Sequence, residues 1–183
     1  MKQFRLLLVL LLTSLAAWAQ PGDPQEVTPE LLKKIKADAE VAAQQFRKTL
    51  PDSDGWSEER KEFAVDTFKI EYIVSRRMDL DYSTQGMNMT VIESTEAYDK
   101  LLNKYYNKLM AILAPEDKKV LQTAQRAWLV YRDAERKLIG LLRNDKYSGG
   151  GTIQSNISVG RYASIVEARV FRLFDYYDEV IKE

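Results

Sequence analysis

The sequence predicts an all-α protein, a bundle of about five helices that pack antiparallel along heptad-like stripes. Apolar residues recur at steps of three and four along most of the chain, which is the period of a helix with one buried face. Only eight glycines and five prolines occur in 183 residues, and a hydrophobic fraction of 45% is sufficient for a core. Because the chain has no cysteine, this core must form without disulfides.

Two helices are expected in the N-terminal part of the chain. The first, over residues 28–50, begins with a capping threonine, a proline suited to a first turn and a glutamate, and the turn-forming stretch 51–55 ends it. The second, over residues 57–80, begins with a serine and two glutamates by the same logic. The polar stretch 81–89 that follows is expected to be a loop.

Three further helices are expected after this loop. The capping-box spacing of Thr90 and Glu93 starts the third, and Pro115 begins the fourth. The three stripes are, in order, Tyr98, Leu102, Tyr105, Leu109 and Ile112; then Leu121, Ala124, Trp128, Tyr131, Glu135, Leu138 and Leu142; then Val159, Ala163, Val166, Val170, Leu173, Tyr177 and Val180. The short connection at Pro115 predicts that the third and fourth helices are antiparallel neighbours.

Residues 1–19 are typical of a signal peptide that is cleaved. Lys2 and Arg5 give a positive start, residues 6–12 are an unbroken apolar run, and residues 17–19 place alanines where a signal peptidase reads small side chains. The apolar run is shorter than the twenty or so residues that a membrane span needs. We therefore expect a periplasmic or secreted bacterial protein that starts at Gln20 and is not inserted in the membrane after cleavage.

The composition argues against two classes of function. Cleavage would leave 25 basic and 27 acidic residues, a net charge of −2, whereas nucleic-acid binders usually carry a basic excess. The chain has no histidine, which removes the commonest general base and the commonest metal ligand. We therefore expect no nucleic-acid binding, no enzymatic activity, no catalytic residues, no cofactor and no metal site.

A polar set shares one face of the expected fourth helix. Its members are Gln125, Trp128, Arg132 and Glu135. On the helix before it, Asp99 is placed to pair with Arg132, and Asn103 to bond Gln125. Such a set either forms a recognition surface or fixes the register of two helices, and heptad-spaced polar residues more commonly set register.

The three glycines at 149–151 also allow two interpretations. Backbone N–H groups at the start of the last helix would bind an anion there. A reversal between two helices requires glycines at such a point just as much. The second interpretation is the simpler one.

Five short motifs in the C-terminal half resemble the LprI family of lysozyme inhibitors. They are Thr84-Gln85-Gly86-Met87-Asn88; Tyr98-Asp99-x-x-Leu102-Asn103-x-x-Tyr106; Gln125-Arg126-x-Trp128-x-x-Tyr131-Arg132-Asp133-Ala134-Glu135; Gly150-Gly151-Thr152; and Arg169. The resemblance covers roughly residues 82–175. Together with the signal peptide expected at 1–19, it divides the chain into three parts, with a lead and two helices at 20–80 outside the match and an LprI-like helical domain at 81–183.

The resemblance supplies a set of candidate binding residues. They are Asp99, Asn103, Gln125, Trp128, Arg132, Asp133, Gly150, Gly151 and Arg169. The chain departs from the family in one respect, because members usually carry cysteines at the positions of Thr90, Arg136 and roughly Arg161. The family's disulfide framework is therefore absent as a set.

The resemblance implies an exported binding protein whose partner is lysozyme or another envelope protein. Because lysozymes are generally cationic, an inhibitor would gain from an acidic edge. Two acidic groups are candidates: Asp79, Asp81, Glu93 and Glu96, and the C-terminal Asp175, Asp178, Glu179 and Glu183. The alternative is a periplasmic structural or interaction module that does not bind lysozyme. A carboxylate pair for glycoside chemistry within the first group is the least favoured reading, since no spacing singles out an acid and a base.

We predict that the two N-terminal helices compensate for the missing disulfides by burying additional apolar surface. Loss of a disulfide commonly costs about 2–5 kcal/mol. Deletion of residues 20–56 should therefore lower the melting temperature sharply, as measured by circular dichroism. An unchanged melting temperature would refute the idea.

Overall fold

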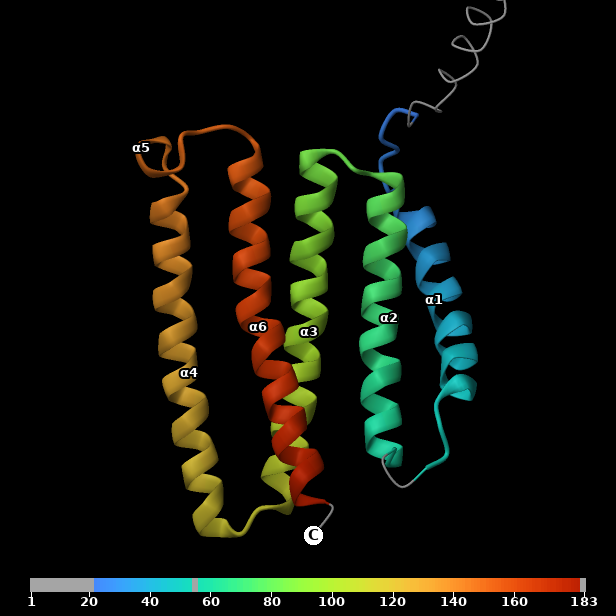
Figure 1. Ribbon diagram of the computed structural model, residues 1–183, viewed down its shortest axis with the longest axis vertical. Helices are drawn as coiled ribbons and strands as arrows, with labels where there is room; N and C mark the ends of the chain where they lie inside the picture. The colour runs from blue at the N-terminus through green and yellow to red at the C-terminus, as the bar shows by residue number, and fades with distance from the viewer. Residues whose placement is uncertain (1–21, 54–55, 182–183) are drawn as a thin grey trace, which may run out of the picture.

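Figure 1 shows the computed structural model of the chain, which describes residues 22–53 and 56–181. Six helices and no strand occur in these residues, so the all-α prediction is confirmed. The helices are α1 (Pro29–Thr49), α2 (Glu58–Leu80), α3 (Thr84–Ile112), α4 (Pro115–Leu142), α5 (Asp145–Ser148) and α6 (Ile153–Val180). The expected signal peptide lies outside the described residues. None of the described helices is long and apolar enough to cross a membrane.

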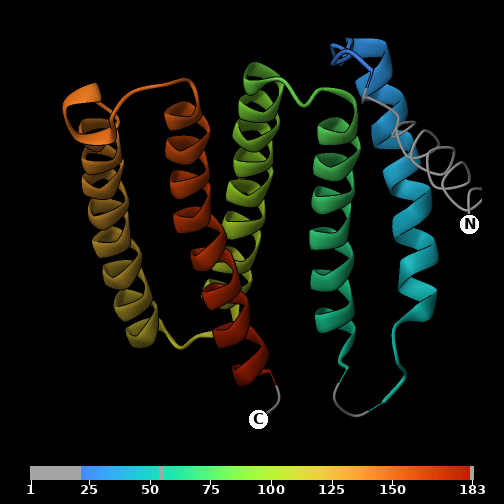
Figure 2. The ribbon, with the colours of Figure 1, turned by 45° about the horizontal axis from the view of Figure 1, so that its top comes forward.

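The five long helices stand side by side in the order α4, α6, α3, α2, α1 (Figures 1 and 2). The last helix of the chain, α6, therefore lies between α3 and α4 and makes its most extensive contact with α3. The prediction that the third and fourth helices would be packed neighbours is wrong, because α4 packs mainly on α6. A short connection sets the direction of the next helix but does not select the face on which it packs.

The core lies between α3 and α6, with Phe63 added from α2 and Leu121 from α4. The stripes predicted for α3 and α6 supply it: Tyr98, Leu102, Tyr105 and Leu109 face Ala163, Val166, Val170, Leu173 and Tyr177, all of them buried. Phe63 of α2 stacks on Phe174 with ring centroids 3.9 Å apart and meets Tyr105 edge-on at 5.2 Å. This aromatic cluster joins three helices near the C-terminal end of α6.

The predicted N-terminal caps of α1 and α2 are confirmed. Thr28 Oγ1 accepts a hydrogen bond from the backbone N–H of Leu31 at 3.3 Å, and Ser57 Oγ accepts one from Arg60 at 3.1 Å. Side-chain caps of this kind satisfy backbone donors that have no partner within the helix. Both caps bond a residue three positions ahead, so the local sequence was sufficient to predict where these two helices start.

The expected loop at 81–89 is wrong, because α3 already begins at Thr84. Ser83 is the cap: its Oγ accepts from the N–H of Gly86 at 3.0 Å, and Asp81 Oδ1 accepts from the Ser83 N–H at 3.1 Å. Thr90, expected to be the cap, is buried inside the helix. The helix therefore starts seven residues earlier than predicted, under a cap built from Asp81 and Ser83 together.

Helix α1 packs along α2 at the edge of the row. Its buried residues are Ile35, Ala39 and Ala43, and Phe46 stacks on Phe68 of α2 with ring centroids 4.4 Å apart. The segment before α1 is also attached to α2, since the N–H of Gln25 donates to the Leu80 carbonyl at 2.8 Å.

Helix α4 is covered less than its apolar stripe predicts. Only Leu121 and Ile139 are buried, whereas Tyr131, Leu138 and Leu142 of the predicted stripe are 52%, 45% and 40% exposed. The stripe prediction for α4 is therefore wrong at those three positions and at the exposed Ala124, and the stripes predicted for α3 and α6 are wrong at their last members, the exposed Ile112 and Val180. The physical reason is that α4 stands at the end of the row and meets its neighbour α6 along one side only.

A short helix and three glycines connect α4 to α6. Gly149, Gly150 and Gly151 have φ values of +77°, +81° and +91°, which residues with a side chain rarely adopt. Gly149 ends α5 in the left-handed conformation. The glycines are therefore required by the reversal of the chain, as the simpler interpretation proposed.

We predict that Gly86→Ala destabilises the start of α3. A methyl group at this position would overlap the carboxyl group of Asp81, which is held by Ser83. The free energy of unfolding should fall by about 1–3 kcal/mol in urea denaturation, the usual cost of overpacking.

Gly140→Ala is the matched control, because it lies within α4 and has nothing within 4 Å of the added carbon. It should raise the free energy of unfolding by up to about 1 kcal/mol. Combining Gly86→Ala with Asp81→Ala should remove the clash. If the double variant were as unstable as the sum of the two single variants, the overlap would not be the cause.

Candidate functional site: a groove between α3 and α4

A groove of about 410 Å³ separates α3 from the first half of α4. It is lined by Asp99, Leu102, Asn103 and Tyr106 from α3 and by Gln122, Gln125, Arg126, Trp128, Leu129 and Arg132 from α4. We call it the α3–α4 groove. It exists because α6 lies between the two helices and holds them apart over part of their length.

Arg169 of α6 contacts two of the side chains that line the groove, Gln125 and Trp128. Its Nε donates to Gln125 Oε1 at 3.0 Å, and its guanidinium carbon lies 5.8 Å from the ring centroid of Trp128. Its Nη2 atom is buried and has no hydrogen-bond partner among the described residues. Burial lowers the pKa of Arg169 from its ordinary value, which means that its charge is incompletely compensated.

Arg132 approaches Trp128 from the same helix. Its guanidinium carbon lies 5.4 Å from the Trp128 ring centroid, and its Nε and Nη2 donate to Asp133 Oδ1 at 3.0 and 2.8 Å. Two arginines of different helices thus lie against one indole ring. The arrangement presents guanidinium donors beside a large aromatic surface.

The two polar pairs expected between the helices do not form. Arg132 bonds Asp133 instead of Asp99, and Gln125 bonds Arg169 instead of Asn103. Asn103 donates to the backbone oxygen and to Oδ2 of Asp99 in its own helix, at 2.9 and 3.3 Å. The polar set therefore connects α4 to α6, and it leaves the side facing α3 open as a groove.

Six of the nine candidate residues meet in or behind the groove. These are Asp99, Asn103, Gln125, Trp128, Arg132 and Arg169. Asp133 stands beside it, exposed and bonded to Arg132. Gly150 and Gly151 lie apart from it, in the connection to α6 near the C-terminal end of α4 (Figure 1).

Sequence reasoning missed five residues of the groove wall. They are Leu102, Tyr106, Gln122, Arg126 and Leu129. Gln122 and Leu129 stand three residues from Gln125 and from Arg132, so helical spacing could have found them. With Arg126, Arg132 and Arg169 against Asp99, the groove carries an excess of positive charge.

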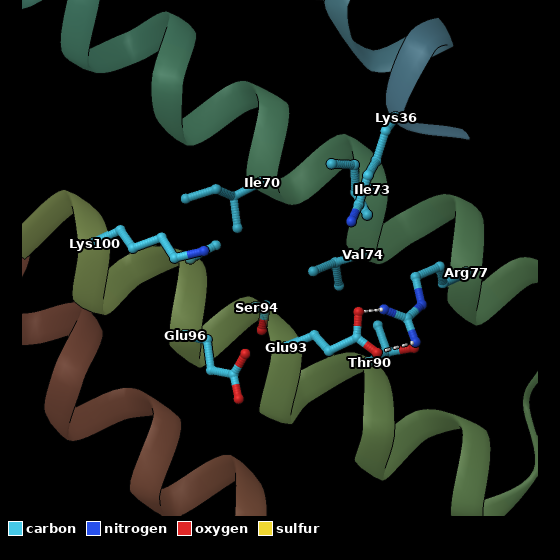
Figure 3. Close-up of a pocket in the computed structure, with 11 residues that line it drawn as sticks. Lys36, Ile70, Ile73, Val74, Arg77, Thr90, Glu93, Ser94, Glu96 and Lys100 are labelled. Carbon is cyan, nitrogen blue, oxygen red and sulfur yellow. Dashed lines mark hydrogen bonds and ion pairs between the residues drawn. The ribbon is translucent and has the colours of Figure 1, made fainter. Parts of the chain in front are cut away.

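A second hollow of about 350 Å³ lies between α1, α2 and α3 (Figure 3). Ile70, Ile73 and Val74 form an apolar wall, and Lys36 and Lys100 reach toward it from α1 and α3. We call it the α1–α3 hollow. It lies in the part of the row farthest from α4.

The buried Arg77 closes one end of this hollow. It forms a paired contact with Glu93, in which Nη2 donates to Oε1 at 3.1 Å. The pair joins α2 to α3 and removes Glu93 from the expected acidic edge. The charged residues Arg77 and Glu93 at the hollow are therefore explained by the contact they make between α2 and α3.

Other acids of the two expected edges also hold the fold together. Asp81 supports the cap of α3, and the buried Asp178 accepts from Ser57 and Arg60 of the segment that starts α2. Asp79, Glu96, Asp175 and Glu179 are exposed, and Glu183 lies outside the described residues. Within the described part of the chain, no group of three or more acidic side chains is placed to hold a metal ion.

The comparison with protein families bears directly on the groove. The family model described as lysozyme inhibitor LprI matches residues 76–173, which is more than half of the chain. The chain belongs to the LprI family. The LprI match runs from the last turns of α2 into α6 and contains every residue of the groove. No curated protein and no solved structure matches the chain.

We predict that Arg169→Met does not destabilise this LprI protein. Methionine keeps the apolar stem that packs near Trp128, and it removes a guanidinium with a buried, unpartnered nitrogen. The free energy of unfolding should stay the same or rise by up to about 2 kcal/mol. Urea denaturation measures it.

Arg172→Met is the matched control, because Arg172 is exposed on the same helix. Its effect should be small, within about 0.5 kcal/mol. A loss of more than about 1 kcal/mol for Arg169→Met would instead mark the Arg169–Gln125 contact as a stabilising link between α4 and α6.

Proposed function

We propose that this protein is exported to the bacterial envelope and inhibits lysozyme by protein–protein contact, with the α3–α4 groove as its binding surface. The LprI match supports the inhibitor role, and the signal-like residues 1–19 support export. No chemistry on the lysozyme substrate is involved, so the protein acts without catalytic residues, cofactor or metal.

The single observation that carries the proposal is that Arg132 and Arg169 both lie close to the ring of Trp128, 5.4 and 5.8 Å from its centroid. Tryptophan and arginine are the residues that most often dominate protein interfaces. Arg126 also lines the groove, and its side chain is exposed. Such a site suits a carboxylate presented by a partner, because a guanidinium binds a carboxylate through paired hydrogen bonds.

Lysozyme has carboxylates in its active site, where a bound inhibitor would block the substrate. Its chemistry depends on two carboxylates that flank the bond being cleaved. An arginine that pairs with one of them would block the substrate and remove the charge that the reaction uses. The exposed acids Asp175 and Glu179 lie outside the groove and would add long-range attraction to a cationic enzyme.

Titration of the mature chain into a lysozyme assay on bacterial cell walls tests the function. Increasing amounts should abolish lysis in a saturable way. Undiminished lysis at a large molar excess, with the inhibitor folded by circular dichroism, would rule out this role for the lysozyme tested.

We predict that Trp128→Ala raises the inhibition constant by at least about 30-fold, the equivalent of about 2 kcal/mol at a central interface residue. Arg169→Met should also raise it, because Arg169 contacts Gln125 and Trp128 and positions them in the groove, and stability should not fall. Arg172→Met, on the exposed side of α6, should leave it unchanged. If all three variants inhibit equally, lysozyme is bound elsewhere than the groove.

A second candidate function is an envelope interaction module that does not bind lysozyme. The uncovered apolar side chains of α4 favour it, since exposed apolar patches mark contact surfaces. Capture of a specific envelope protein by a chain that fails to inhibit lysozyme would support this function.

A further inference from the structure

Helix α4 carries a second apolar stripe that its packing on α6 does not use. It consists of Val120, Ala124, Ala127, Tyr131, Ala134, Leu138 and Leu141. The steps between them are four and three in strict alternation, over three complete heptads. We call it the outer stripe. Such a sequence is the pattern of a helix that pairs with another helix.

Every residue of the outer stripe is exposed. Val120 is 69% exposed, Tyr131 52% and Leu141 50%, and the three alanines are exposed as well. A strip of seven apolar residues with no polar interruption is unusual on the surface of a protein that exists only as a monomer. Its position at the open end of the row leaves room for another helix (Figures 1 and 2).

We propose that the outer stripe of α4 pairs antiparallel with the outer stripe of a second copy of this chain. A two-fold interface requires a surface that is complementary to itself. The sizes of the side chains along the outer stripe meet this requirement in one register. In that register Ala124 lies opposite Leu141 of the second copy, Ala127 opposite Leu138, and Tyr131 opposite Ala134.

Each layer of this pairing combines one alanine with one large side chain. The volume of the contact is therefore even along its length, and the alanines leave room for the large residues opposite. A parallel pair would instead place each residue against itself. Tyr131 would then crowd Tyr131, while the layers of Ala127 and Ala134 would be left underfilled, so volume favours the antiparallel pair.

The residues beside the outer stripe oppose no like charges in the antiparallel register. Lys137 lies opposite Val130 of the second copy on one side, and Glu135 lies opposite Trp128 on the other. The stripe itself is free of charge. Repulsion between like charges at such flanking positions would have argued against pairing.

The size of the contact indicates a reversible dimer. The residues that face one another in this register, 124–141, span about 27 Å of helix, and Val120 extends beyond the pairing. A helix pair of that length buries an area at the lower end of specific interfaces, about 1,200 Å² in total. We therefore expect the dimer population to rise with protein concentration.

Most of the groove faces away from the outer stripe. Gln122 and Leu129 of the groove stand two residues from Ala124 and Tyr131, which places them about 200° around the helix. The outer stripe and the groove share no residue, but Trp128 borders both, so the dimer contact would lie beside one edge of the groove. The inference goes beyond the proposed function and does not depend on lysozyme binding.

Sedimentation equilibrium of the mature chain tests the proposal. The average mass should rise from one copy toward two across a concentration series. Leu138→Glu places a charge in the contact and should weaken the dimer by at least about tenfold. Gly140→Glu, which adds the same charge about 200° around the same helix, should leave the dimer unchanged.

Cross-linking tests the direction and the register. The chain has no cysteine, so introduced thiols are unique probes. The double variant Ala127→Cys, Leu138→Cys should form a covalent dimer on mild oxidation, because the two positions face each other between copies. Ala127→Cys alone should not.

Three results would overturn the proposal. A monomer throughout the concentration series would show that the outer stripe does not pair. A dimer as stable with Leu138→Glu as with Gly140→Glu would place the contact elsewhere. Efficient cross-linking by Ala127→Cys alone would show a parallel pair instead of the antiparallel one. All variants are at exposed positions, and circular dichroism confirms that they fold.

Discussion

The contact between α3 and α6 is the interaction on which the rest of the structure depends. The most buried large side chains, among them Tyr105, Leu102 and Leu173, come from these two helices. Helix α2 joins them through Phe63, α1 rests on α2, and α4 rests on α6. Without disulfides, the free energy of folding comes chiefly from removing this apolar surface from water. The α3–α4 groove exists because α6 occupies this central place.

Much of the fold was predictable because helix starts and buried faces are local properties. Thr28 and Ser57 act as caps within their own turns, and the apolar stripes of α3 and α6 define their inner faces. The start of α3 was missed because three residues form its cap together. Asp81 accepts a hydrogen bond from Ser83, and its carboxyl group occupies the place that a side chain at Gly86 would take. The order of helices in the row was missed because periodicity identifies an apolar face but not the helix that covers it.

The candidate site was predictable in its members and not in its contacts. The spacing of Gln125, Trp128 and Arg132 placed them on one face of a helix, and the structure gathers them in the groove. Their partner turned out to be Arg169, forty-four residues beyond Gln125 in the sequence. Arg136 lies over the ring of Tyr162, with its guanidinium carbon 5.6 Å from the ring centroid. A cation–π contact thus joins α4 to α6 there.

The central helix α6 is also synthesised after all the other described helices. Its 28 residues supply one side of the main interface, and Asp178 near its end bonds Ser57, 121 residues earlier. A chain still held at its C-terminus by a ribosome or an export channel lacks this side of the core. Its earlier helices then have only one another to cover their apolar faces, so stable tertiary structure is delayed until release. For the export proposed above, that delay keeps the chain unfolded while it passes through a narrow pore.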